Sequence, residues 1–112
     1  MTHNKNSTRY YSSRQEKAVA KALKGKVVAN SGAPIFVAGD VKTSQWLIEC
    51  KTCINQKKSF SIKKEWLEKN KEEAFAMRKD YNALAFNFGD NKNYYIVDEK
   101  TFKEILKWQE EV

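Results

Sequence analysis

The sequence predicts one domain of mixed α/β class, with a mixed central sheet flanked by helices. Apolar residues recur at helical spacing in three stretches, and residues 45–52 alternate between two faces in the way a strand does. The run Gly89-Asp90-Asn91-Lys92 separates two β-rich segments and is typical of a four-residue hairpin turn. These segments give the order α-β-β-β-α-β-β-α within residues 12–112, and the polar residues 1–11 are expected to be a flexible basic arm.

The first helix is predicted from about Ser13 to Lys24. Ser13 and Glu16 have the S-x-x-E spacing of a capping box, and Gly25 follows as a stop. An i, i+3, i+4, i+7 series is expected to face the core, namely Glu16, Val19, Ala20 and Leu23. Glu16 therefore has two interpretations: it caps its own helix, or it leans over the sheet toward a metal ion or a water molecule.

Short strands are predicted next, over residues 26–30 and 35–41. A glycine within a strand pattern marks a bulge or a close backbone approach, so Gly39 is in a position to aim the side chain of Asp40. Residues 42–44 then turn the chain into the following strand.

The strand over residues 45–52 carries the most informative alternation. One face receives Trp46, Ile48 and Cys50, and the other receives Leu47, Glu49 and Lys51. Glu49 and Lys51 are thus expected side by side, about 7 Å apart along the strand. The same alternation assigns Cys50 to core packing.

A long helix is predicted over residues 61–79. Its inward side is expected to carry Ile62, Lys63, Trp66, Leu67, Asn70, Ala74 and Met77, with Phe75 on the outward side. Two hairpin strands follow, over residues 83–88 and 93–97. Asp98 is expected to cap a last helix to about Gln109, with Phe102, Ile105, Leu106 and Trp108 toward the core.

Composition bounds the function. Hydrophobic residues make up 41% and charged residues 31%, which is typical of a globular chain, and no apolar run reaches the roughly 20 residues that span a bilayer. The polar start lacks a signal-peptide core, so we expect a cytoplasmic protein without membrane attachment. The formal net charge of +7 favours a polyanionic partner such as nucleic acid, although solubility alone also explains such a charge.

Three polar groups point to hydrolysis of a phosphodiester. Asp40 and Glu49 are predicted at facing ends of two strands joined by a tight turn, where their oxygens can share one Mg²⁺ ion. The backbone carbonyl of Cys50 is a further candidate ligand, Glu16 can complete the shell, and Lys51 can orient the attacking water or stabilise charge on the phosphate. The alternative is that Asp40 belongs to a turn and that Glu49 and Lys51 form a solvated pair.

Cys50 and Cys53 form a lone C-x2-C. A structural zinc site needs four ligands, and the single histidine, His3, lies in the expected arm. We therefore interpret both thiols as ordinary reduced side chains.

The residues Glu16, Gly39-Asp40 and Glu49-Cys50-Lys51, in this order of elements, resemble the PD-(D/E)XK nuclease superfamily. Within it, Ser31-Gly32, the E-C-K-T ending and the run SFSIKKEWL resemble the small Holliday junction resolvases of archaea, phages and Gram-positive bacteria. The similarity covers residues 13–98. Gly39 stands where the superfamily motif has proline.

The resemblance implies a restriction-endonuclease-like core and a homodimer that cuts four-way DNA junctions with magnesium or manganese, in a bacterial or phage-infected cell. It assigns metal binding to Asp40 and Glu49, the catalytic lysine to Lys51, the helix-borne acid to Glu16 and a loop serine near the scissile phosphate to Ser31. Phosphate contacts are expected from basic side chains, namely Arg14, Lys57, Lys58, Lys63 and Lys64. Two alternatives stay open: a nuclease of this superfamily acting on other duplex or flapped DNA, and a basic DNA-binding module without catalysis.

Overall fold

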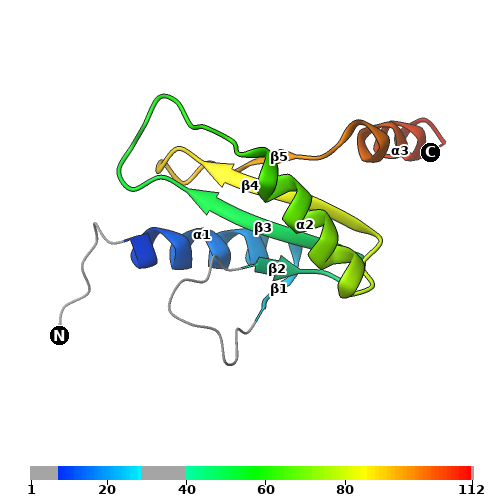
Figure 1. Cartoon of the computed structure of the whole chain (residues 1–112), viewed down its shortest axis with the longest axis horizontal. Helices are drawn as coiled ribbons and strands as arrows, with labels where there is room; N and C mark the ends of the chain where they lie inside the picture. Colours follow the sequence, from blue (N-terminus) through cyan, green and yellow to red (C-terminus); the bar gives the residue numbers. More distant parts are fainter. Residues whose placement is uncertain (1–7, 29–39, 112) are drawn as a thin grey trace.

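The computed structural model describes residues 8–28 and 40–111, which form a five-stranded mixed sheet with three helices (Figure 1). The elements are α1 (Thr8–Leu23), β1 (Lys26–Val27), β2 (Asp40–Lys42), β3 (Trp46–Thr52), α2 (Lys64–Ala76), β4 (Tyr81–Asn87), β5 (Tyr94–Ile96) and α3 (Glu99–Glu110). The predicted mixed α/β class is confirmed. No helix among the described residues is long and apolar enough to cross a membrane.

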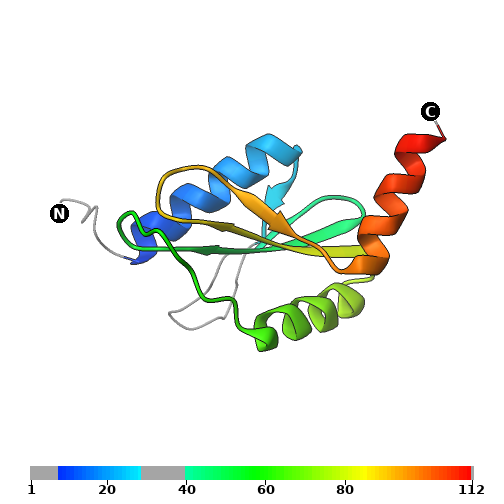
Figure 2. The ribbon, with the colours of Figure 1, turned by 90° about the horizontal axis from the view of Figure 1, so that it is seen from above.

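The strands lie in the sheet in chain order, β1-β2-β3-β4-β5. β3 and β4 are parallel, and the other neighbouring pairs are antiparallel. A parallel pair needs a crossover connection, and α2 provides it. The view along the sheet in Figure 2 has α1 over one face and α2 over the other.

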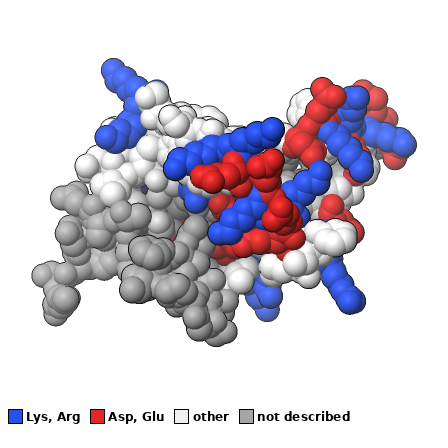
Figure 3. Space-filling model, viewed as in Figure 1, with Lys and Arg blue, Asp and Glu red and all other residues white. Residues whose placement is uncertain are grey.

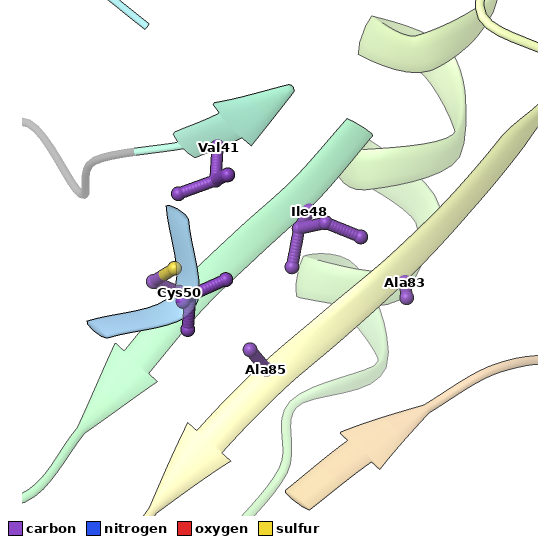
Figure 4. Packing of buried hydrophobic residues seen from close by; sticks show 6 residues of the cluster. Val41, Ile48, Cys50, Ala83 and Ala85 are labelled. Carbon is purple, nitrogen blue, oxygen red and sulfur yellow. The ribbon is translucent and has the colours of Figure 1, made fainter. Parts of the chain in front are cut away.

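The alternation predicted for β3 is confirmed, because its two faces meet different helices. Ile48 and Cys50 are buried on the α1 side, together with Val41 of β2 (Figure 4). The same cluster includes Val19, Ala83 and Ala85. Small side chains on β4 allow α1 to approach the sheet closely, and they form a compact core.

The α2 side is more polar. Leu47 and Leu84 are fully buried, and Asn70 of α2 is 1% exposed. The Asn70 amide donates to the Leu47 carbonyl at 3.4 Å and accepts from the Asn82 amide at 2.8 Å. These bonds satisfy a buried amide and fix the rotation of α2 on the sheet.

The predicted start of the first helix is wrong. α1 begins at Thr8, so Ser13 lies inside the helix and cannot form a capping box with Glu16, and residues 8–11 of the expected arm are helical. The inward series also changes, because Gln15 is 2% exposed whereas Leu23 is 36% exposed. This extra length was not predicted because the start of the sequence is polar. For the same reason Gln15 was not counted as a core residue.

The end of α1 differs in a smaller way. Lys24, with φ of 56°, adopts the left-handed conformation that terminates the helix, and Gly25 follows it. A Cβ atom at Gly25 would lie 2.6 Å from the Lys42 carbonyl oxygen. Gly25 is therefore needed for the close approach of the chain to β2.

Several other predicted boundaries shift. β1 covers residues 26–27, and residues 29–30 of the predicted 26–30 and 35–39 of the predicted 35–41 lie outside the described residues. The helix α2 is shorter than the predicted 61–79, and β4 begins at Tyr81. Lys63 is the N-cap residue of α2 and is exposed, and Met77 at the C-cap is 37% exposed, so neither faces the core as predicted. Phe75 is exposed as predicted, at 84%.

The predicted start of the last helix is confirmed, but its predicted packing against the core is wrong. The Asp98 side chain accepts a hydrogen bond from the Thr101 backbone amide at 2.8 Å, as expected of a cap. Phe102, Leu106 and Trp108 are 41–52% exposed, whereas Ile105 is half-buried. Figure 1 shows the reason, because α3 stands beyond the end of the sheet instead of covering it.

Candidate metal centre

Asp40 and Glu49 face each other across β2 and β3. The register pairs Asp40 with Glu49 and Val41 with Ile48, so the two carboxylates share the α2 side while the apolar pair faces α1. The turn between the strands fixes this register, because the Thr43 hydroxyl accepts from the Trp46 amide at 3.0 Å. The sequence prediction that the two carboxylates converge is confirmed.

A third carboxylate, Glu73 of α2, completes the cluster. One oxygen from each of Asp40, Glu49 and Glu73 lies within 4.8 Å of the other two. The sequence analysis missed Glu73, although at ~100° per residue it lies only about 20° from Trp66 around the helix. An acidic residue on the inward side of a helix was the available signal.

The cluster is electrostatically unfavourable as it stands. Burial, followed by the facing Glu49 and Glu73 carboxylates, raises the pKa of Asp40 to about 7. Burial also raises the pKa of Glu49, although Lys51 and Lys69 act in the opposite direction. Glu49 is 3% exposed, so the alternative of a solvated Glu49–Lys51 pair is wrong.

The residues fit a hard divalent cation. Magnesium binds oxygen ligands at ~2.1 Å, so oxygens on opposite sides of one ion lie about 4.2 Å apart. Oxygens at neighbouring positions around the same ion lie about 3.0 Å apart. The oxygens of Asp40, Glu49 and Glu73 lie within 4.8 Å of one another, which is close to the spacing that one ion requires. A divalent ion would also neutralise the mutual repulsion that raises the pKa of Asp40.

Lys51 lies beside the cluster on the same face of the sheet. Its Nζ is 3.4 Å from Glu49 Oε2 and 4.5 Å from the centre of the Trp66 ring. A carboxylate on one side and an indole face on the other hold the ammonium group in place. Its side chain remains 22% exposed, so it stays accessible to a ligand.

Glu16 is not one of the three clustered carboxylates. It lies on α1, whereas Asp40, Glu49 and Glu73 share the α2 side of the sheet. Its charge nevertheless contributes to the raised pKa values of Asp40 and Cys50, so it is within electrostatic reach. Its role as a ligand remains a prediction.

Two other predicted site positions are Ser31 and the backbone carbonyl of Cys50. Ser31 lies outside the described residues, as do Gly32 and Gly39. The Cys50 carbonyl follows Glu49 directly along β3, beyond the last described β2–β3 pair, and its role as a ligand remains a prediction. Burial raises the pKa of the Cys50 thiol, which keeps it protonated in the core.

The predicted DNA-binding residues come from three segments. Arg14 lies on α1 with its guanidinium 5.5 Å from the ring centres of Tyr10 and Tyr11. Lys57 and Lys58 are exposed in the loop after β3, and Lys63 and Lys64 are exposed at the start of α2. Arg14 thus lies on the other face of the sheet from Lys63 and Lys64.

The chain was compared with protein-family models, with curated proteins and with solved structures, and none of the three comparisons gives a match.

Proposed function

We propose that the chain is a metal-dependent endonuclease that hydrolyses phosphodiester bonds in branched DNA. The observation that carries this proposal is the β2–β3 register, which pairs Asp40 with Glu49 on one face of the sheet and leaves Lys51 beside them. Glu73 adds a third oxygen donor. Three carboxylates and one lysine match the needs of phosphodiester hydrolysis.

Each side chain has a chemical role in this proposal. Magnesium or manganese, when bound, supplies charge neutralisation at the phosphate and an acidified water. Asp40, Glu49 and Glu73 would hold the ion, and the ion pair with Glu49 orients the Lys51 ammonium group. Lys51 then stabilises the negative charge that develops on the phosphate oxygens.

Charge supports a nucleic-acid substrate. The net charge is +7, although acidic and basic side chains are interspersed over α2 in Figure 3. Phosphate contacts therefore fall to the lysines of the loop after β3, at 57 and 58, and to Lys63 and Arg14 at the edges of the domain. Such contacts give binding that depends on salt and little on sequence.

Four-way junctions are the proposed substrate, cut by a homodimer that presents two centres. A candidate dimer surface is the apolar side of α3, where Phe102, Leu106 and Trp108 are 41–52% exposed. The membership of the PD-(D/E)XK superfamily and of its resolvase branch belongs to the same proposal.

The test compares a four-way junction with a linear duplex of the same arm sequences, each with Mg²⁺. We expect paired nicks in the junction and much slower cutting of the duplex. Equal cleavage rates on the junction and the duplex would contradict the junction assignment and favour a nuclease for other duplex or flapped DNA. Binding without any cleavage would favour a non-catalytic DNA-binding module.

A further inference from the structure

A row of side chains continues from the candidate centre across the sheet. Lys51 of β3 pairs with Phe86 of β4, and Phe86 pairs with Tyr94 of β5, so the three side chains share the α2 face. The neighbouring row contains Asp40, Glu49 and the buried Leu84. The aromatic row therefore begins at the proposed catalytic lysine.

The rings in and around this row contact one another. The ring centres of Phe86 and Tyr94 are 5.7 Å apart, and Phe88 lies 5.4 Å from Phe86 and 5.9 Å from Tyr94. Phe60 bridges this group to the site, 5.7 Å from Phe86 and 6.2 Å from Trp66. An almost continuous aromatic surface thus leads from Lys51 to the edge strand.

This surface is partly open. Tyr94, its outermost member, is 48% exposed, and Phe86 and Phe88 are half-buried. Positive charge borders it, because Lys51 and Lys63 both lie over the Trp66 ring and the Lys57 amide donates to the Phe88 carbonyl at 2.9 Å. In Figure 3 the surface over the end of β4 and the loop after β3 is largely uncharged, with basic side chains at its borders.

Aromatic rings bordered by lysines suit a nucleotide, whose base stacks on a ring while its phosphate meets a cation. Bases inside a duplex have both faces covered by their neighbours, so only an unpaired base can stack on Tyr94. Tyr94 lies two strand spacings from Lys51, about 10 Å. A base held there belongs to a nucleotide near the cleaved bond.

We propose that Phe86, Phe88 and Tyr94 form a stacking surface for an unpaired base of branched DNA next to the cleaved bond. This inference rests on the proposed nuclease function. It adds an unpaired base at the branch to the recognised substrate, and it assigns the exposed ring of Tyr94 to that base.

The chain supplies a matched control for the test. Tyr95 is the next residue of β5, is 42% exposed and pairs with Ala85, so its side chain lies on the α1 face. Binding of a fluorescently labelled oligothymidylate is measured by anisotropy without metal. We expect Tyr94→Leu to weaken binding about tenfold, whereas Tyr95→Leu and Tyr94→Phe leave it unchanged. Equal effects of Tyr94→Leu and Tyr95→Leu would overturn the inference.

A second measurement isolates the base from the phosphates. When every nucleotide of the oligothymidylate is replaced by an abasic site, wild-type binding should weaken by at least this factor, and the Tyr94→Leu variant should show a smaller fold loss. Equal fold losses of binding in the wild type and in Tyr94→Leu would show that the ring and the base do not interact. If Tyr94→Leu changes the molecular mass in solution instead, the surface is an interface between copies and the inference is wrong.

The two proposals fail separately. In a junction that carries one unpaired 2-aminopurine at the branch, stacking should quench its fluorescence in the wild type and in Lys51→Ala but not in Tyr94→Leu. If the wild type quenches the fluorescence but cleaves no DNA, the result supports the stacking surface and contradicts the nuclease function. If the wild type cleaves without quenching, and the wild type and Tyr94→Leu cleave the junction at equal rates, the result contradicts only the stacking surface.

Discussion

At the scale of single residues, the centre combines three clustered carboxylates, one of them buried, with one restrained lysine. Glu49 is 3% exposed, faces Asp40 and forms an ion pair with Lys51 at 3.4 Å. Trp66 packs on the other side of the Lys51 ammonium group. Such a cluster keeps its side chains in place before any ligand arrives, which is a requirement of catalysis by charge stabilisation.

Glu73→Gln tests the third ligand. The substitution preserves shape but removes a charge from the cluster, so we expect the affinity for Mn²⁺ to fall at least about tenfold in calorimetric titrations. The neighbouring Glu72 is exposed and lies outside the cluster, and Glu72→Gln should bind Mn²⁺ like the wild type. Equal affinities for the two variants would exclude Glu73 as a ligand.

The raised pKa of Asp40 predicts how stability depends on pH. The folded protein holds this proton up to about pH 7, whereas the unfolded chain releases it near 3.8, so the contribution is present at low pH and lost as pH rises. The free energy of unfolding of the metal-free protein should fall by about 2 to 3 kcal/mol from about pH 5 to about pH 8. Urea titrations measure it.

Asp40→Asn is the control for this prediction. It removes the titrating group, so most of the decrease between the two pH values should disappear. An unchanged pH dependence in the variant would mean that another group causes it.

Residue-level prediction from sequence worked where periodicity alone decided the outcome. Alternation in β3 correctly separated Cys50 from Glu49 and Lys51. Prediction failed for Glu73, because the inward side of α2 was chosen from mainly apolar residues and an acid in the carboxylate cluster breaks that rule. Functional sites often violate the local pattern, and the proposed metal-binding role of Glu73 would explain this departure.

At the scale of elements, the hairpin between β4 and β5 is held against the loop after β3. Gly89 has φ of 86°, and a Cβ atom there would lie 2.2 Å from the Asn55 carbonyl oxygen. The Gly89 amide donates to the Asn87 side chain at 3.0 Å. This packing positions the loop that carries Lys57 and Phe60.

Gly89→Ala should destabilise the fold by about 1 to 3 kcal/mol or more, because it adds backbone strain and a collision with backbone atoms. Asn91 in the same hairpin also has a positive φ, of 66°, and Asn91→Gly removes strain without a collision. Thermal unfolding should show a clear decrease for the first variant and no decrease for the second. Equal melting temperatures for Gly89→Ala and the wild type would contradict the packing.

Helix boundaries show the limit of local signals. The Ser13-x-x-Glu16 spacing predicted a helix start, yet α1 begins five residues earlier, at Thr8. A capping box identifies residues able to cap, and the same residues also fit inside a helix when the preceding segment is helical. Asp98 acts as a cap because its side chain accepts from the Thr101 amide.

At the scale of the molecule, α3 presents an apolar side that the described residues leave largely uncovered. Its amphipathic pattern predicted an apolar stripe, but a pattern cannot identify the surface on which a stripe packs. Trp108 contacts Tyr81 with ring centres 5.5 Å apart and is still 43% exposed. This arrangement suits an interface with a second copy.

Leu106→Glu should therefore convert a dimer into a monomer. Light scattering should give twice the 13.0 kDa chain mass for the wild type and the single-chain mass for the variant. Lys107→Gln changes the net charge by the same amount at an exposed position of α3 outside the apolar stripe, and it should remain dimeric. A monomeric wild type would contradict the dimer.

Asp40 and Lys51 are proposed to act together in metal-dependent cleavage, and cleavage of a four-way junction with Mg²⁺ measures whether they do. The wild type and Asp80→Asn, which changes an exposed acid outside the cluster, should cut the junction. Asp40→Asn and Lys51→Ala should each lose about 100-fold or more in rate, because each removes a charge needed at the reacting phosphate. Cleavage at the wild-type rate in either variant would contradict the proposed active site.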